Sequence, residues 1–466
     1  MRRSLIGLLS CLCLSVCYAQ NPAPEKLILQ HVTVVNARDG SLRRNATVVI
    51  KEGRIRSVGK KLSAADKAKA LIIDATGKYL VPGLWDMHVH SALAPVWDEH
   101  ILYPLCVANG ITGIRDMGGD PDLLEKRRDL INKGEVLGPH IVMSGPFLVR
   151  GKTSAEIIAV NSPEEGRHAV DTLKRRGVDF IKILDGLTRE DYFAIPEESA
   201  KQHISFVGHV PYGVSVAEAS QAGQHSIEHL SGVALACSSK EMSLREQMVA
   251  AAQNRDYKKL LALRKEVVDT YDPAKAELLF KVLHKNQTWQ VPTLVWTQAT
   301  VSFEAPDVLS DPRLNYVPQT VRAAWNPQKL LQNTSPEEIE VVRSEIALNM
   351  KIVKAMNEAG VPLLAGSDGP DPFVFPGFSL HDELEWLVRS GLTPLQSLQA
   401  STLNPAEFLG QSALYGTIEP GHAADLVLLE ANPLEDIRNT RRIAAVILGG
   451  KYYSRIKLDK NLQRFN

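Results

Sequence analysis

The sequence has no excess charge of either sign, few cysteines and few long apolar runs. Its 466 residues carry 53 basic and 53 acidic side chains, so no basic footprint points to nucleic acid or to an anionic membrane surface. After residue 19 no apolar stretch is long enough to form an integral membrane span. Apolar residues at 44% and charged residues at 23% are globular values. The length predicts a large domain with a smaller companion.

Residues 1–19 have the pattern of a secretory signal peptide. Two arginines follow Met1, an apolar stretch runs from Leu5 to Val16, and the small residue Ala19 precedes Gln20. We therefore expect an exported protein, periplasmic or secreted.

Three of the five cysteines, Cys11, Cys13 and Cys17, lie in that segment. Cleavage before Cys17 or Cys11 with attachment of a lipid is a less favoured alternative, because the valine before Cys17 is bulky and the run before Cys11 is short. Cys106 and Cys237 remain in the mature chain, and we expect two free thiols rather than a disulfide.

Two β-rich segments flank a long middle region that alternates short apolar runs with helical stretches. The flanking segments, 20–78 and 410–466, predict one small β-sandwich domain built from both termini. Residues 79–409 have the βαβ rhythm of a parallel sheet, and eight strand–helix units predict an α/β fold of the distorted (β/α)8 TIM-barrel type. The expected strands are Tyr79–His90, Gly113–Asp116, His140–Phe147, Asp179–Leu184, Ile204–Val210, Ser226–His229, Gln290–Val295 and Pro362–Ser367.

The intervals between the last three strands are long and contain amphipathic stretches at Glu241–Arg264 and Pro273–His284. These stretches predict either additional helical cover or a lid over the mouth of the barrel.

Residues with metal-binding chemistry recur at the ends of the expected strands. His88 and His90 are two apart on one strand, so their side chains share a face and can ligate one divalent ion. The carboxyl ends of barrel strands converge on one cavity. The full set of candidate metal ligands is His88, His90, Lys182, His209, His229 and Asp368.

Lys182 is the most specific member of this set. It lies between Ile181 and Ile183 in a short strand, where an unpaired ammonium is costly to bury. Desolvation favours the neutral amine, which can add carbon dioxide to form a carbamate with two oxygens. Such a group can bridge two zinc-class ions, and a hydroxide held between the two ions is a strong nucleophile.

The ordered motifs resemble those of the amidohydrolase superfamily, in particular its imidazolonepropionase-like and prolidase-related metal-dependent hydrolases. The resemblance covers residues 26–455. The motifs that carry it are Val81–His90, Gly113–Gly118, Phe180–Ile183, Gly208–His209, Ser226–His229, Gly366–Asp368 and Gly421–Val427.

The resemblance implies a binuclear site. His88, His90 and Asp368 would hold one metal, His209 and His229 would hold the second, and carboxylated Lys182 would bridge them. Asp368 would be the catalytic residue that takes a proton from the attacking water and returns it to the leaving amine. In deaminase branches a glutamate stands where this chain has Tyr212, which argues against a mononuclear deaminase.

The expected reaction is cleavage of an amide bond in a dipeptide or an N-acyl amino acid. Tyr212 and Arg150 are the candidates for binding the substrate carboxylate. Asp116 is a candidate neighbour of the ligands, while Phe373 and Phe375 would either line the pocket or belong to the core.

The same site would also suit a cyclic-amide hydrolase or a lactonase, and a catalytically silent binding protein is the alternative from another class. The composition is compatible with a homo-oligomer.

Overall fold

The computed structural model describes residues 26–59, 62, 67–93, 97–305, 307–332 and 334–462. The expected signal peptide and the three cysteines within it lie outside these residues. Among the described residues, Cys106 and Cys237 are both buried free thiols, as expected. No helix in the described ranges has both the length and the apolar character needed to span a membrane.

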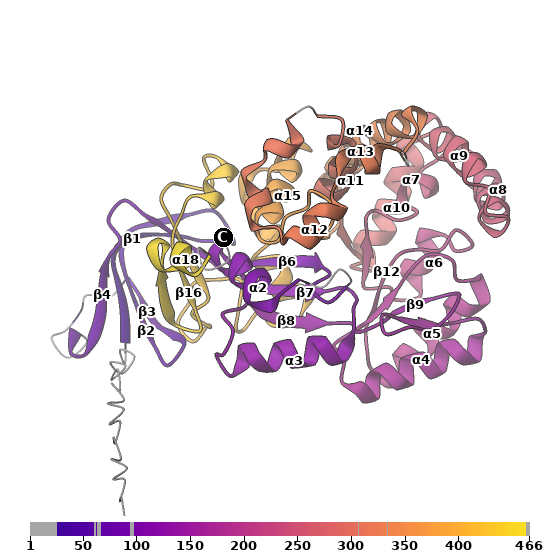
Figure 1. Cartoon of the computed structure of the whole chain (residues 1–466). Helices are drawn as coiled ribbons and strands as arrows, with labels where there is room; N and C mark the ends of the chain where they lie inside the picture. The colour runs from indigo at the N-terminus through magenta and orange to yellow at the C-terminus, as the bar shows by residue number, and fades with distance from the viewer. Residues whose placement is uncertain are drawn as a thin grey trace, which may run out of the picture.

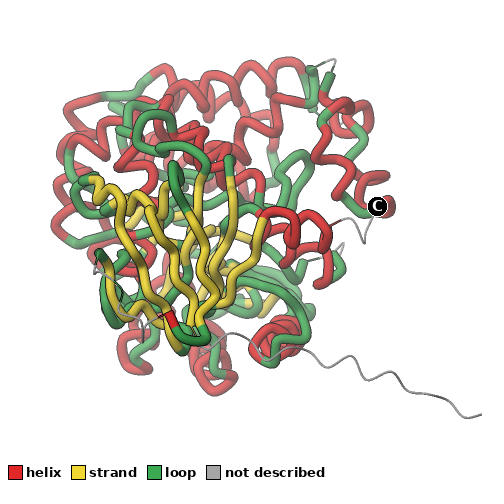
Figure 2. The backbone as a smooth tube through the Cα atoms, turned by 90° about the vertical axis from the view of Figure 1, so that its left-hand side faces the viewer, coloured by secondary structure: helices red, strands yellow, loops and turns green. Residues whose placement is uncertain are grey.

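Strands from the two ends of the chain form one sheet (Figures 1 and 2). In Figure 1 the indigo N-terminal strands lie beside the yellow C-terminal ones. The pairs are antiparallel, except that β1 is parallel to β4 and to β5. The order is β17-β16-β15-β5-β1-β2-β3, with β4 also on β1, and the strands are β1 (Lys26–Val35), β2 (Leu42–Lys51), β3 (Arg54–Val58), β4 (Ala70–Asp74), β5 (Tyr79–Pro82), β15 (Leu426–Leu429), β16 (Ile443–Leu448) and β17 (Lys451–Ser454).

This terminal sheet has a hydrophobic cluster of its own. Leu29, Val34 and Ile50 from the N-terminal strands meet Leu80 and Ile447 within it. Burial of such side chains stabilises the folded state by about 2 kcal/mol each. The two ends of the chain therefore depend on each other for a core.

The middle of the chain forms parallel sheets that carry the candidate ligands. Their strands are short and almost wholly buried, as expected for parallel strands covered by helices. One sheet contains β6 (Leu84–Val89), β7 (Ile111–Asp116) and β8 (His140–Met143) in that order. The other has the order β10-β9-β11-β12-β13-β14, with β9 (Phe147–Val149), β10 (Ile157–Ala159), β11 (Ile181–Ile183), β12 (Phe206–Gly208), β13 (Ser226–Glu228) and β14 (Trp289–Val291).

Backbone hydrogen bonds connect the edges of these two open sheets. Asp179 N donates to Met143 O at 2.9 Å, which links the β8 edge to the segment entering β11. At the other edge Leu364 N donates to Gln290 O, and Met87 N donates to Ala365 O, both at 2.9 Å. The result is a TIM-barrel-like α/β arrangement made of two open sheets, where we expected a distorted (β/α)8 barrel.

Four expected strands differ from the observed ones. In the expected strand Gln290–Val295, the last two residues already belong to the helix Leu294–Ser302. Residues 79–90 form two strands, because β5 joins the terminal sheet and β6 starts the middle region. Residues 140–147 contribute to both β8 and β9. The expected strand at 362–367 is reduced to an isolated bridge between Gln290 and Leu363, with hydrogen bonds on either side. Short apolar runs fix burial but do not fix how far a ladder continues.

Helices surround the parallel sheets, and several begin and end at residues that the sequence marks clearly. Ser162 caps α4 by accepting from Glu165 N, Pro163 follows as the first helical residue, and Gly177 ends the helix at φ +77°. The helices that follow β6 to β13 are α2 (Glu99–Ala108), α3 (Pro121–Asn132), α4 (Pro163–Arg176), α5 (Arg189–Gln202), α6 (Val216–Gln221), α7 (Val233–Ala236), α8 (Glu241–Gln253), α9 (Tyr257–Asp269) and α10 (Pro273–Lys285). Those after β14 are α11 (Leu294–Ser302), η1 (Val308–Ser310), η2 (Pro312–Tyr316), α12 (Gln319–Ala324), α13 (Pro327–Gln332), α14 (Pro336–Glu358), α15 (Phe378–Arg389), α16 (Pro394–Ala400), α17 (Leu403–Phe408), η3 (Ile437–Arg441) and α18 (Arg455–Leu462).

The two long amphipathic stretches are helical, as expected, and form α8, α9 and α10. Figure 1 shows α8 and α9 together with α14 at the end of the molecule away from the terminal sheet.

Candidate active site

Four histidines lie at the ends of three strands, and one aspartate lies beside the first of these strands. His88 lies in β6 and His90 one residue beyond it, while His209 and His229 directly follow β12 and β13. Asp368 is attached to the first of these strands, because its backbone N donates to His88 O at 2.7 Å. The fold therefore brings together residues that are up to 280 positions apart in the sequence.

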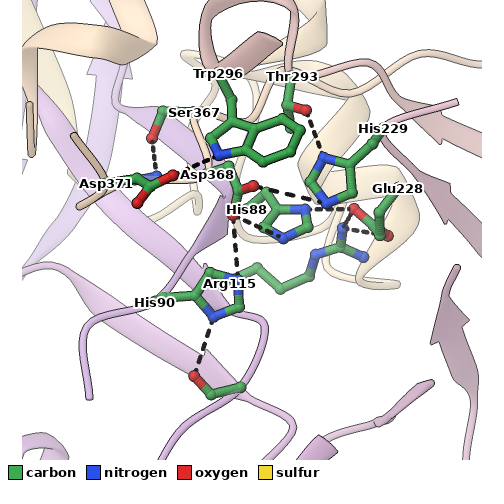
Figure 3. Close-up of polar contacts among 12 residues, drawn as sticks. His88, His90, Arg115, Glu228, His229, Thr293, Trp296, Ser367, Asp368 and Asp371 are labelled. Carbon is green, nitrogen blue, oxygen red and sulfur yellow. Dashed lines mark hydrogen bonds and ion pairs between the residues drawn. The ribbon is translucent and has the colours of Figure 1, made fainter. Parts of the chain in front are cut away.

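Asp368 lies at the centre of this group (Figure 3). Its Oδ1 is 3.3 Å from His88 Nε2 and 3.2 Å from His90 Nε2, and its Oδ2 is 3.7 Å from His229 Nε2. The ring centroids of His209 and His229 are 5.0 Å apart, which extends the group to the fourth histidine. Burial alone would raise the pKa of Asp368, but His229 and His90 beside it lower that pKa overall.

The other ring nitrogen of each histidine is engaged by a neighbouring oxygen. His88 Nδ1 lies 2.8 Å from Glu228 Oε2, and His90 Nδ1 lies 3.1 Å from the carbonyl oxygen of Gly118. The corresponding distances are 2.8 Å from His209 Nδ1 to Asp185 Oδ2 and 2.7 Å from His229 Nδ1 to Thr293 Oγ1. Partners of this kind fix the orientation of the ring. In His88, His90 and His229 they leave Nε2 as the nitrogen that faces Asp368.

This donor set fits a divalent metal ion. His88 Nε2 is buried and has no hydrogen-bond partner, which is costly for a nitrogen that binds nothing. Together with His90 and Asp368 it forms a group whose ligand atoms lie within 4.8 Å of one another. Two ligand atoms bound tetrahedrally to one zinc ion are roughly 3.4 Å apart, close to the distances observed from Asp368.

Lys182 lies in β11 beside this group and is 1% exposed. Desolvation lowers the pKa of Lys182 to about 8, although the nearby Glu228 and Asp368 act in the opposite direction. Arg115 lowers that pKa further. A substantial fraction of the amine is therefore neutral near pH 8, and the neutral form is the one that can react with carbon dioxide.

Glu228 and Arg115 form a buried ion pair that the sequence analysis did not assign to the site. Arg115 Nη2 lies 3.0 Å from both carboxylate oxygens of Glu228, and its Nη1 donates to Ser226 Oγ at 3.0 Å. Glu228 is the residue before His229, so its side chain points to the other side of the strand, where it meets His88. A glutamate at a buried strand position was the only sequence signal for this partner.

Next to the histidines is a cavity of about 540 Å³. His209 and His229 lie at its wall with Asp185 and Tyr212, which places Tyr212 where the sequence analysis expected a substrate contact. The cavity continues between α7, α8, α9, α11 and α14. Helices α8 and α9, inserted between the last strands, thus form part of its wall, and a lid role for them stays a prediction.

Arg264 also lines this cavity and was not among the expected residues. Its Nε and Nη2 donate to the two carboxylate oxygens of Glu345 at 2.8 and 2.6 Å. This bidentate pair connects α9 with α14.

Arg150, the other expected substrate contact, is not brought to the cavity. Its Nη1 donates to Asp191 Oδ2 at 2.8 Å, and its side chain is 47% exposed. Asp191 is buried on α5, so Arg150 serves as the partner of a carboxylate beside the parallel sheet.

Asp116 and two aromatic residues have structural partners. Asp116 Oδ2 accepts from the backbone N and the hydroxyl of Ser91 at 2.7 and 2.6 Å, so it holds the turn after His90. Phe373 and Phe375 are buried and make ring contacts with Trp325, not with the histidine-lined cavity.

Comparison with known proteins agrees with this arrangement. The amidohydrolase family model matches residues 296–452. Over 94% of its length the chain is 25% identical to ochratoxinase of Aspergillus niger, of which it covers 93%. A dihydroorotase from Ligilactobacillus salivarius is 24% identical over 83% of this chain and 86% of its own. A Xaa-Pro dipeptidase structure with bound methionine has a TM-score of 0.65 at 21% identity, covering 92% of this chain and all of that one, and supports the fold.

Residues 296–452 thus match the amidohydrolase family, and the chain is similar to its members over most of its length. These matches support a hydrolase that acts on carbon–nitrogen bonds.

Proposed function

We propose that this chain is an exported, binuclear, metal-dependent amidohydrolase that cleaves the amide bond of a dipeptide or an N-acyl amino acid. The observation that carries the proposal is the position of Asp368. One carboxylate oxygen faces His88 and His90, and the other faces His229. A single carboxylate between two sets of imidazoles, beside a buried lysine, supports a two-metal site.

In this proposal His88, His90 and Asp368 would hold one ion of the zinc class, and His209 and His229 would hold the other. Lys182 would join this ligand set after its neutral amine has added carbon dioxide, which forms one N–C bond and releases one proton. Bound ions would polarise the scissile carbonyl and lower the pKa of water.

The side chains of this chain supply positioning and proton transfer. Asp368 accepts the proton of the attacking water and returns it to the leaving nitrogen, so that the amine departs as a neutral group. The partners of the four Nδ1 atoms hold each ring in place while this happens. Tyr212 lines the same cavity and would contact the substrate.

The substrate class rests on the cavity and on the relatives. A volume of about 540 Å³ is in the range that accommodates an extended organic molecule. The structural likeness to a Xaa-Pro dipeptidase favours a dipeptide or related amide. The similarity to dihydroorotases supports a second candidate, a hydrolase of cyclic amides, and a lactonase would need the same machinery.

Export is proposed from the signal-like residues 1–19, and lipid anchoring and a homo-oligomeric state stay open predictions. Cell fractionation with detection of the mature chain tests the first point. Recovery of the uncleaved protein in the cytoplasm would contradict it.

The decisive test of the proposal is metal content measured together with hydrolysis. Elemental analysis should find about two transition-metal ions per chain, and the purified protein should hydrolyse members of a dipeptide and N-acyl amino acid panel. Lys182→Ala should lose most of the metal and the activity. Lys201→Ala, on the exposed side of α5, is the matched control and should change neither. Fewer than one ion per chain in an active wild-type protein would refute the binuclear site.

A further inference from the structure

The cavity beside the histidines has two chemically different ends. At one end His209 and His229 share the wall with Asp185 and Tyr212. Away from the histidines, the wall is formed largely by apolar side chains of the inserted helices. Representative members are Ala234, Leu235, Met248, Val268, Val342 and Leu348.

The charged side chains that line this part of the cavity are paired with one another. Arg264 is the only lysine or arginine among the described residues that line the cavity, and Glu345 engages it through two hydrogen bonds. The guanidinium also interacts electrostatically with Glu338 in the first turn of α14. The cation is therefore already paired. The rest of this wall combines apolar side chains with the uncharged polar groups of Thr297, Thr300, Thr334 and Asn349.

A small polar substrate would leave most of this space without contacts. When a ligand covers apolar surface that was exposed to water, the complex is stabilised by about 25 cal/mol for each Å² covered. A bulky apolar group is consequently the occupant that such a wall stabilises best.

We propose that this apolar end is the specificity pocket for a large apolar group of the substrate, aromatic or long-chain aliphatic, attached to the amide that is cleaved at the histidines. The inference rests on the proposed amidohydrolase function and specifies its substrate class. In this proposal the side chains of α7, α8, α9, α11 and α14 determine which substrates bind. They favour bulky apolar amides over compact cyclic ones.

Two substrate series test the inference with the metal-loaded, full-length protein. In the first, N-acyl-L-alanines carry acetyl, hexanoyl or phenylacetyl groups. In the second, N-acetyl amino acids carry alanine, leucine, phenylalanine or tryptophan side chains. We expect kcat/KM to rise by at least about tenfold from the smallest to the largest group in one series, and that series identifies which side of the scissile bond enters the pocket.

Ala234→Phe fills the pocket with a side chain of its own. Ala234 is half-buried on α7, and the ratio of kcat/KM for the largest to the smallest substrate should fall by about tenfold, mainly through KM. Ala217→Phe is the matched control, because Ala217 is equally half-buried on α6 but does not line the cavity. Val268→Asn on α9 tests the same point without adding bulk, since it introduces a polar group into the pocket.

The outcomes separate the inference from the function on which it rests. Hydrolysis of amides with no dependence on apolar size would overturn the inference and leave the proposed function standing. An equal loss for large and small substrates in both Ala234→Phe and Val268→Asn would also overturn it. Hydrolysis of no amide by protein that contains its metal would overturn the proposed function and the inference together.

Discussion

The Nδ1 atom of His88 lies 2.8 Å from Oε2 of Glu228, and both side chains are fully buried. This contact determines that Nε2 of His88 is the nitrogen directed at Asp368. Arg115 bonds both oxygens of Glu228 and so fixes the carboxylate in position. The orientation of one candidate metal ligand thus depends on a buried ion pair outside the metal group.

Glu228→Gln should weaken metal binding while keeping the shape of the side chain. Loss of a carboxylate partner of a ligating histidine lowers metal affinity by about 10- to 100-fold. Titration of the metal-free protein with zinc measures this change. Glu241→Gln, which removes a carboxylate from an ion-paired position on α8, is the control and should leave the affinity unchanged. Unaltered affinity in Glu228→Gln would refute the positioning role.

Asp368→Asn should lower kcat by about 10²- to 10⁴-fold, because the amide cannot accept the proton of the attacking water. The measurement is kcat at matched metal content, so that loss of a ligand is separated from loss of the base. Asp371→Asn is the neighbouring control. Its oxygen accepts from Trp296 Nε1 at 2.7 Å, which an amide oxygen can also do, and kcat should stay within about tenfold.

Removal of the metal should destabilise the folded chain. A ligand present at 100 times its Kd adds about 2.7 kcal/mol to the stability of the form that binds it. Thermal unfolding with and without a chelator should therefore show a lower Tm after chelation, and zinc should restore it. The same comparison in His90→Asn should give a smaller shift. An identical Tm under all conditions would argue against a bound metal.

Arg150→Ala should have little effect on catalysis, because Arg150 bonds Asp191 and does not line the cavity. We expect kcat/KM to change less than about twofold and stability to fall by about 1 kcal/mol, as for a half-exposed ion pair. Tyr212→Phe is the contrasting variant, with an expected rise in KM. A large loss of activity in Arg150→Ala with normal stability would instead show that Arg150 binds the substrate.

The stability of the metal-free protein should fall in mild acid through His381. Burial lowers the pKa of His381 from its ordinary value of 6.5 to about 4, so only the unfolded chain binds a proton between these pH values. The contribution of this residue is fully present above pH 6.5 and is lost as the pH falls towards 4. It amounts to about 2 kcal/mol between pH 7.5 and pH 5.

Chemical denaturation of the wild-type protein and of His381→Gln at these two pH values checks this. The wild-type protein should lose more stability between them than the variant does. Equal losses would show that other groups dominate the acid dependence.

Much of the architecture followed from local patterns. The apolar run at Asp179–Leu184 predicted a parallel strand, and β11 formed within it. The pairing of strands was less accessible. Nothing local distinguishes Tyr79–Pro82, which joins the terminal sheet, from Leu84–Val89, which joins the parallel one.

By itself, the sequence determined which residues have metal-binding chemistry, because an imidazole at a strand end and a lysine between two isoleucines are local facts. Only the tertiary structure decided what these residues meet. Glu228 contacts His88, which lies 140 positions earlier in the chain. The arginine that lines the cavity is Arg264, not Arg150, and Arg264 is held there by its pairing with Glu345 on another inserted helix. Such contacts depend on how helices and strands pack in three dimensions, which the spacing of residues along the chain does not encode.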